Sequence, residues 1–541
     1  MLVGVSLIGM QKGSEETIAA VATPPGEGGI GIIRVSGSQA FPIAERIFQR
    51  ARATQHPTAP RPRGTTGGLE SHRIYFGTIR DPETGEVLDR ALLLTFRAPH
   101  SYTGEDVVEF SCHGSPLLLR RVLQLIWREG ARPAQPGEFT QRAFLNGKLD
   151  LAQAEAVADL IRARTESQLR AALYLHEGAL SRTIRQLSDA LLALLAQVEA
   201  TIDFSEEIGE LDRDAFATEL NELQKQLEHL LRRAQSGRLL REGVRVAIVG
   251  RPNVGKSSLL NTLLGEERAI VTPIPGTTRD LIEEAFQIQG VPIVVLDTAG
   301  LREHPDPVEQ IGIERTRRAV EHADLLLVVC DLSEGLTEAD RAILATLPAD
   351  KPRIMVWNKA DLVPVSDFAP LLHVPPTSGG NQTGSGSVAP TSEGNQTGSG
   401  SPCLQGEPKG GGLQKLACLP AVPSADMRNL KEEVSENSIA VRVSALTGEG
   451  LPALCEAILE AVNLTGVGEE SLLLTHARHV QAVETARQHL LSALNATRAG
   501  LPLEVLAVDL RGAWLALGEI TGETVDEQLV DRIFRDFCIG K

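Results

Sequence analysis

The sequence predicts a multidomain α/β plus all-α protein in which one helical domain is interrupted by an inserted α/β unit. Short β-branched runs separated by Gly and Pro fill residues 17–147. Ala, Leu, Glu, Gln and Arg dominate from Leu149 to about Leu240, and helical composition returns after about Leu464. Because two helical stretches flank the α/β unit, we interpret that unit as the inserted part.

The first region contains four short apolar runs that are typical of strands. They lie at Ile18–Val21, Ile30–Val35, Ala91–Phe96 and Val107–Phe110, with turn residues between them. This pattern predicts an α/β or α+β domain. A stretch rich in Pro, Arg and Gly, Thr54–Gly68, is expected to form a surface loop.

The second region has apolar residues at helical spacing. Leu151, Ala154, Val157, Ala158 and Ile161 would share one face of a helix, and no Pro interrupts residues 149–240. This pattern predicts a helical bundle.

The inserted unit has a different apolar pattern. Val244–Val249, Val291–Leu296, Leu325–Cys330 and Ile354–Trp357 are nearly continuous apolar runs. Strands that are buried on both faces have this composition, so the unit is predicted to hold a doubly wound parallel sheet.

A low-complexity repeat lies inside the inserted unit. Thr377–Ser387 (TSGGNQTGSGS) recurs as Thr391–Ser401 (TSEGNQTGSGS). Such residues cannot build a core, so a flexible loop is expected. We place the domains at residues 1–147, 148–241, 242–463 with an insert at 364–435, and 464–541.

Composition excludes several classes of protein. The 541 residues are 42% hydrophobic, and the best candidate run, Ala190–Val198, is far shorter than the ~18 residues of a membrane span. Leu2–Met10 has no basic residues before it, so we expect a cytoplasmic protein without a membrane partner. Six cysteines are too few for a disulfide scaffold, and Cys330 and Cys112 are expected in the core.

Charge is unevenly distributed along the chain. The net charge is −17, but the first 150 residues hold 17 basic and 15 acidic side chains. General nucleic-acid binders are usually basic. Any contact with RNA should therefore be local, and the N-terminal region is the favoured place.

Gly250–Ser257 (GRPNVGKS) matches the pattern G-x-x-x-x-G-K-[ST]. It follows one predicted strand and precedes a predicted helix, which is the context that a P-loop requires. Backbone N–H groups would then surround the phosphates, Lys256 would neutralise the β- and γ-phosphates, and Ser257 would hold Mg²⁺.

Three further motifs follow in the order expected of a GTPase. Asp297–Gly300 (DTAG) and Asn358–Asp361 (NKAD) follow predicted strands, and Ser444–Leu446 (SAL) follows a third. The Asp361 carboxylate would accept hydrogen bonds from the N1–H and 2-amino groups of guanine, which adenine lacks. Thr278 would complete the Mg²⁺ shell. The sequence therefore predicts a Ras-like G domain that binds GTP.

The expected GTP-binding residues come from these motifs and from the segment between the first two. They are Asn253, Val254, Gly255, Lys256, Ser257, Ser258, Thr272, Pro273, Ile274, Pro275, Gly276, Thr277, Thr278, Asp297, Thr298, Ala299, Gly300, Asn358, Lys359, Ala360, Asp361, Ser444, Ala445 and Leu446.

Hydrolysis must differ from that of Ras-like proteins, which carry Gln after the DxxG motif. Leu301 stands at that position and cannot orient water. Glu309 is a candidate for the task, and the alternative is an ordinary solvated glutamate. Asn253, together with carbonyl groups of Thr272–Thr277, offers oxygen ligands for a monovalent cation that would replace an arginine finger.

The P-loop and Pro275–Asp280 (PGTTRD) resemble those of the Era/Der group of GTPases. Three other stretches narrow the resemblance: Ala22–Arg34, Pro136–Leu151 and the terminal Phe537–Lys541 (FCIGK). Together they resemble the MnmE (TrmE) family over nearly the whole chain. Thr54–Gly68 and the repeat-bearing insert depart from it.

The resemblance implies a tRNA-modifying GTPase. MnmE proteins act with a flavoprotein, MnmG or GidA, in a heterotetramer that adds an aminomethyl or carboxymethylaminomethyl group to carbon 5 of the wobble uridine. It also implies that the N-terminal domain resembles folate-binding domains, binds 5-formyl- or methylene-tetrahydrofolate and forms a homodimer. The G domains would associate in a K⁺-dependent manner during hydrolysis.

The resemblance also implies residue roles. Glu309 would position water, and Cys538 would be a functional cysteine whose role, nucleophile or redox group, stays open. The implied ligands of K⁺ are Asn253, Thr272, Ile274 and Thr277, and the implied folate contacts are Arg34, Glu109, Lys148 and Lys541. Prenylation of Cys538 is disfavoured, because Gly540 and Lys541 do not fit that signal.

Two other functions were weighed. A ribosome-assembly GTPase of the Era/Der type is the main alternative, but such proteins append a KH-type or second G domain, whereas residues 471–541 are predicted helical. A membrane-remodelling GTPase would need an amphipathic or hydrophobic anchor, and the sequence shows none.

Overall fold

The structure is a computed structural model that describes residues 16–51, 68–266, 284–296, 317–363, 439–465, 474–535 and 537–540. The chain divides into two compact units. The first comprises Met1–Gly243, Gln289–Pro292 and Gly466–Lys541, and the second comprises Val244–Ile288 and Ile293–Thr465. The low-complexity insert and nearly all of Thr54–Gly68 lie outside the described residues.

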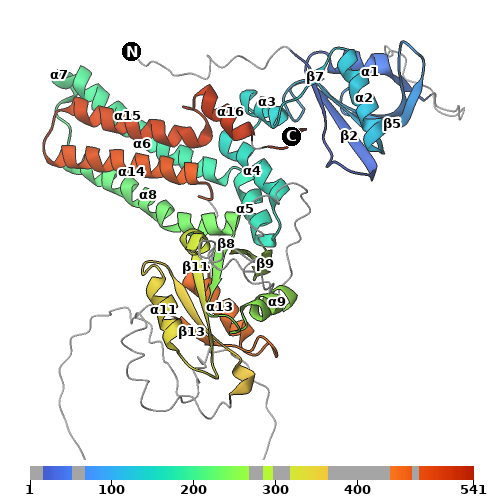
Figure 1. Ribbon diagram of the computed structural model, residues 1–541. Coiled ribbons are helices and arrows are strands. Elements are labelled where there is room, and N and C mark those ends of the chain that lie inside the picture. The colour runs from blue at the N-terminus through green and yellow to red at the C-terminus, as the bar shows by residue number, and fades with distance from the viewer. Residues whose placement is uncertain are drawn as a thin grey trace, which may run out of the picture. The chain divides into compact units, whose positions relative to one another are not determined.

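The described part of the first unit opens with a seven-stranded sheet in the order β3-β4-β5-β6-β2-β1-β7. Helices α1 (Ala40–Ile47) and α2 (Pro116–Arg128) belong to the same domain (Figure 1). The strands are β1 (Ile18–Val21), β2 (Gly28–Ser36), β3 (Phe48–Arg50), β4 (Arg73–Arg80), β5 (Val87–Phe96), β6 (Val107–Gly114) and β7 (Arg132–Pro133).

Alternation along these strands separates the two faces of the sheet. Ile33, Leu93 and Phe110 are fully buried and form one core with residues of α1 and α2. Their neighbours Arg34 and Glu109 point to the opposite face, where they pair across β2 and β6. The helices thus cover one face and leave the other available for a site.

The rest of the first unit is a helical bundle made from two distant stretches of chain. Figure 1 shows α14 and α15, in red, lying along α6 and α8, in green. Leu residues of these four helices form one buried cluster. The described helices are α3 (Glu138–Leu145), α4 (Leu151–Arg162), α5 (Glu166–His176), α6 (Ala179–Asp203), α7 (Ser205–Ile208), α8 (Arg213–Glu242), α14 (Ala477–Arg498), α15 (Leu503–Thr521) and α16 (Glu527–Arg535).

Local sequence explains where the bundle helices begin. Asp150 accepts a hydrogen bond from the backbone N–H of Gln153, whose side chain accepts one from the Asp150 N–H in return. Thr165 and Gln168 form the same reciprocal cap at α5. Such caps stabilise a helix start by about 1 kcal/mol. Among the described helices, none is long and apolar enough to cross a membrane.

The second unit contains a sheet in the order β13-β12-β11-β8-β10-β9. The first five of these strands pair in parallel. Helix α11 lies on one side of the sheet and α9 and α13 on the other (Figure 1). The elements are β8 (Val244–Val249), α9 (Lys256–Glu266), β9 (Glu284–Ile288), β10 (Val291–Leu296), β11 (Leu325–Asp331), α11 (Glu338–Thr346), β12 (Arg353–Asn358), η3 (Ala360–Leu362), β13 (Ile439–Arg442) and α13 (Leu451–Ala461).

The predicted fold class is confirmed, and the structure adds strands beyond the predicted runs, namely β3, β4 and β7 in the first sheet and β9 in the second. Strand β9 was not predicted, because Glu284 and Gln287 interrupt its apolar pattern at the edge of the sheet. Gln289 and Gly290 connect it to β10, and both have positive φ angles, as a two-residue hairpin turn requires.

Candidate functional site

The P-loop connects β8 to α9 and needs glycine at two positions. Gly250 has φ +151° and Gly255 has φ +93°. A Cβ at Gly250 would lie 2.3 Å from the Val329 carbonyl oxygen, and one at Gly255 would lie 2.2 Å from Asn358 Nδ2. Only a residue without a side chain allows this close approach, so both positions require glycine for the loop to pack against β11 and Asn358.

Lys256 and Arg251 have different surroundings within the loop. Lys256 Nζ donates to the carbonyl oxygens of Gly250 at 2.9 Å and Arg251 at 2.7 Å, and burial lowers its pKa. An ammonium group in this place can neutralise phosphate. The Arg251 guanidinium instead pairs with Asp340 at 2.8 Å and Glu334 at 2.9 Å, so it fixes the loop to the start of α11.

Asn358 joins the P-loop to the loops that follow β12 and β13. Its Nδ2 donates to the Val254 carbonyl at 2.8 Å, and its Oδ1 accepts from the Ala445 N–H at 3.0 Å. The side chain is 2% exposed. The structure therefore brings two sequence motifs together through one buried amide, a role that the sequence analysis did not assign.

The residues predicted to recognise guanine meet at the same edge of the sheet. Ser444 Oγ donates to Asp361 Oδ1 at 2.5 Å, and Lys359 Nζ pairs with Asp331 at 2.7 Å. Leu446, one of the residues predicted to bind GTP, is 84% exposed. Thr262 on α9 donates to the Ala445 carbonyl at 2.7 Å. This last contact was missed, because no motif marks Thr262.

The other residues predicted for this site fall into two groups, those in or next to the P-loop and those outside the described part of the chain. Asn253 is exposed within the P-loop, Ser257 is half-buried in the first turn of α9 after Lys256, and Ser258 beside it is exposed. Residues 272–278, 297–300 and 309 lie outside the described residues.

A second cluster lies on the open face of the N-terminal sheet. Arg34 Nε donates to Glu109 Oε1 at 2.7 Å, and both side chains are largely buried. The guanidinium lies 5.1 Å from the centre of the Tyr102 ring and 5.6 Å from that of Phe139. Arg34 Nη1 also donates to the Gly540 carbonyl at 3.5 Å. A charged pair framed by aromatic rings therefore meets the C-terminal tail.

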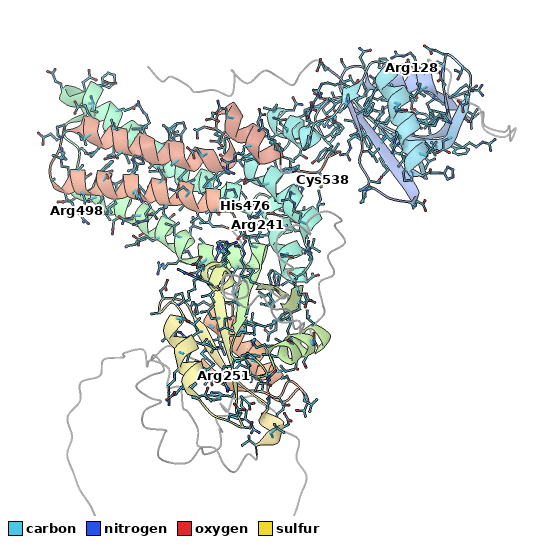
Figure 2. The ribbon with its side chains drawn as sticks, in the orientation of Figure 1. Arg128, Arg241, Arg251, His476, Arg498 and Cys538 are labelled. Carbon is cyan, nitrogen blue, oxygen red and sulfur yellow. The ribbon has the colours of Figure 1, made fainter. Side chains whose placement is uncertain are left out.

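The tail is fixed by close backbone contacts. Gly540 has φ +97°, and a Cβ there would lie 2.3 Å from the Val21 carbonyl oxygen. The Gly137 N–H donates to the Cys538 carbonyl at 3.4 Å, while the Cys538 side chain is exposed (Figure 2). Lys148 Nζ donates to the Pro99 carbonyl at 3.2 Å. Lys541 lies outside the described residues.

The described cysteines divide as expected. Cys112 and Cys330 are buried, and burial raises the pKa of each thiol to about 12. Cys455 is also buried, so Cys538 is the exposed thiol of the described part of the chain. A buried thiol with a raised pKa is inert at neutral pH.

The parallel sheet, the glycine-dependent P-loop and the Asn358–Asp361 and Ser444–Leu446 loops define a P-loop GTPase. Residues 151–538 match the family described as the MnmE helical domain, and residues 17–148 match the GTP-binding protein TrmE N-terminus.

Curated relatives match over nearly the full length. The tRNA modification GTPase MnmE of Moorella thermoacetica is 46% identical over 97% of this chain and 100% of its own. That of Heliobacterium modesticaldum is 44% identical over 97% of this chain and 99% of its own. The chain therefore belongs to the MnmE family of tRNA modification GTPases.

One solved structure similar to this chain is that of Era in complex with MgGDPNP and nucleotides 1506–1542 of 16S ribosomal RNA. It is 27% identical, covers 40% of this chain and 56% of the Era chain, and has a TM-score of 0.24.

Proposed function

We propose that this GTPase acts with an MnmG/GidA-type flavoprotein to add a carboxymethylaminomethyl or aminomethyl group to carbon 5 of the wobble uridine of certain tRNAs. In this reaction GTP would be hydrolysed at the inserted unit, and a folate bound at the N-terminal sheet would supply a one-carbon unit. The observation that carries it is the second cluster, where Arg34 and Glu109 meet the tail that bears the exposed Cys538.

The chemistry of the second cluster fits a folate. A pterin offers a pair of N–H donors that a carboxylate accepts, and Glu109 presents its carboxylate beside Arg34. Tyr102 and Phe139 add apolar ring surface around the guanidinium. Lys148 and Lys541 would attract the glutamate tail of the folate, and the folate would supply the one-carbon unit.

At the nucleotide site the chain's own groups bind, orient and select. Lys256 would hold the β- and γ-phosphates, and Ser257 with Thr278 would hold Mg²⁺, which neutralises charge on the phosphate oxygens. Asp361 would accept the guanine donors, and its bond from Ser444 fixes the carboxylate for that task. Glu309 would orient the attacking water.

We assign K⁺ to the exposed Asn253 side chain and to oxygens of Thr272, Ile274 and Thr277. Asn253 is exposed within the P-loop and has a φ of +66°. Exchange of K⁺ for Na⁺ at equal ionic strength should slow GTP turnover about tenfold, and Asn253→Ala should do so in K⁺ while GTP still binds. Steady-state hydrolysis in both salts measures this, and equal rates would remove the cation from the mechanism.

The open sheet face supports a homodimer. Phe76 and Leu92 are paired neighbours on β4 and β5 and are 57% and 41% exposed, and Ile74 is 67% exposed. A contiguous apolar patch of this kind marks a protein interface. We assign it to a second copy of this chain, and the tRNA and the flavoprotein to other surfaces of a cytoplasmic complex.

A ribosome-assembly GTPase of the Era/Der type is the alternative. Full-length similarity to proteins named MnmE favours tRNA modification over it. Mass spectrometry of wobble uridines from a strain that lacks the gene decides between them. We expect loss of the modified uridine and its return with the intact gene, whereas normal uridines with a ribosome-assembly defect would favour the alternative.

A further inference from the structure

Two carboxylates one turn apart on α4, the buried Glu155 and the half-buried Asp159, hold different parts of the helical bundle. Glu155 accepts from His479 Nε2 at 2.7 Å and Arg478 Nη2 at 2.8 Å, and both partners belong to α14. Asp159 accepts from Arg241 Nε at 3.0 Å and from His476 Nε2 at 2.8 Å. These partners belong to two separate parts of the chain.

Arg241 and His476 flank the inserted unit in the sequence. Arg241 lies in the last turn of α8, two residues before Gly243, where the first stretch of the first unit ends. His476 is the N-cap of α14, the first described helix after the chain returns to that unit. Both side chains bond the same Asp159 carboxylate, and Figure 2 labels the two residues in one region of the molecule. One carboxylate therefore holds both described ends that flank the insertion.

The contacts of Asp159 are those of an ionised group. Burial opposes its charge, but the hydrogen bonds and charges of His476 and Arg241 outweigh burial and hold the pKa of Asp159 below its ordinary value. Gln168 Nε2 on α5 donates to the Arg241 carbonyl at 2.8 Å, so the end of α8 is held by its backbone as well.

A cavity next to Asp159 leaves room for the side chains around it to take a second set of contacts. A cavity of about 200 Å³ is lined by Asp159, Arg241, Gln168 and Thr475 among others. The Thr475 hydroxyl is buried and has no hydrogen-bond partner among the described residues. A buried unpaired hydroxyl is unfavourable, so a shift of the side chains around the cavity that gave it a partner would be stabilising.

The other end of α4 reaches the tail site. Leu151 and Ala154 are fully buried and pack in one cluster with Phe534 and Phe537. Phe537 directly precedes Cys538. A single helix of twelve residues, Leu151–Arg162, thus runs from the ends that flank the insertion to the segment that bears the exposed thiol.

We propose that Asp159 is a positioning residue that couples the inserted unit to the tail site through α4. Arg241 and His476, at the two ends that flank the insertion, are both held by Asp159. A nucleotide-driven movement of the inserted unit therefore shifts α4, instead of being taken up by rearrangement of the two connecting segments. The proposal rests on the proposed function, because it assumes that GTP hydrolysis drives chemistry near Cys538.

Alkylation of Cys538 by a maleimide, followed by peptide mass spectrometry, tests this on the purified full-length protein. We expect the alkylation rate of the wild type to differ at least threefold between GDP and GDP with aluminium fluoride. Asp159→Asn and His476→Gln should each bring that ratio to about one. Hydrolysis of GTP should stay within about twofold, since neither residue belongs to the nucleotide site.

Glu155→Gln is the matched control. This substitution removes the charge of a buried carboxylate on the same helix, and the partners of that carboxylate lie only on α14. It should therefore lower the melting temperature, while the alkylation rate of Cys538 should still depend on the bound nucleotide. The proposal is overturned if the wild type shows no nucleotide dependence, if Asp159→Asn and His476→Gln keep it, or if Glu155→Gln loses it equally. The assay contains no tRNA, so its failure is distinct from failure of the proposed uridine chemistry.

Discussion

The two candidate sites of this molecule are built in opposite ways. Most of the nucleotide site comes from short contiguous motifs, such as Gly250–Ser257, that stand at the carboxyl ends of parallel strands. The second site joins Arg34, Glu109 and Gly540, which lie up to 506 positions apart in the sequence. The first can be recognised from spacing alone, whereas the second exists only once the chain has folded.

The difference has a consequence for how each site tolerates substitution. In the nucleotide site, loss of one recognition group leaves an unpaired donor on the ligand, which costs affinity steeply. In the second site, the position of the tail depends on close backbone packing around Gly540. Substitutions that affect ligand recognition at one site, or backbone packing at the other, therefore test whether the two sites are built differently.

The largest effect is expected at the guanine-binding carboxylate. Asp361→Asn replaces a hydrogen-bond acceptor with a donor, so it should weaken the binding of guanine nucleotides at least about 100-fold. It should favour the binding of xanthine nucleotides, whose 2-oxo group accepts a hydrogen bond. Titration with fluorescent GDP and XDP measures both affinities. Unchanged affinity for GDP would remove Asp361 from base recognition.

The next largest effect is expected from a substitution in the C-terminal tail. Gly540→Ala adds a Cβ against the Val21 carbonyl at positive φ, so we expect the tail to shift and folate affinity to fall about tenfold, with GTP hydrolysis unchanged. Gly130→Ala is the control, because Gly130 also has positive φ but nothing within 4 Å. Calorimetric titration with 5-formyl-tetrahydrofolate measures the affinity, and equal affinities in the two variants would contradict the packing argument.

A smaller effect concerns the helical bundle that connects the sites. Burial lowers the pKa of His479 to about 4, despite the nearby Glu155 carboxylate. The folded state therefore favours the neutral imidazole, and its contribution to stability is present above about pH 6.5 and is lost as the pH falls toward 4. The loss is a few kcal/mol at most, since one pKa unit is about 1.4 kcal/mol.

Urea unfolding between pH 7 and 4.5 measures that loss. The Glu155 carboxylate, whose pKa lies below its ordinary value, contributes to acid destabilisation only at lower pH. His479→Asn should be less stable at pH 7 and should have a flatter pH dependence down to 4.5. An unchanged slope in this variant would assign the acid sensitivity to another group.

The sequence predicted the fold class because each region has its own periodicity. Helical spacing predicted the bundle, and nearly continuous apolar runs predicted β8, β10, β11 and β12. The edge strand β9 was missed, because its polar positions hide the pattern. The boundaries assigned to the domains stay a prediction.

The sites were predictable to different depths. Motif spacing identified the P-loop and the Asp361 loop, but not the buried Asn358 that ties them together or the Thr262 contact. Only the family resemblance suggested Arg34 and Glu109, because a lone charge in a strand carries no pattern. The partners of Asp159 are 82 and 317 positions away, so spacing could not reveal them.

The central claim is that hydrolysis and uridine chemistry belong to separate sites, and Cys538→Ser tests it most directly. The serine keeps the size of the side chain and loses the thiolate, which is the better nucleophile and redox group near neutral pH. The measurement pairs the GTP hydrolysis rate of the purified variant with the nucleoside profile of tRNA from cells that carry it. The account predicts hydrolysis within about twofold of wild type together with loss of the modified wobble uridine, and a normal modified uridine in those cells would contradict it.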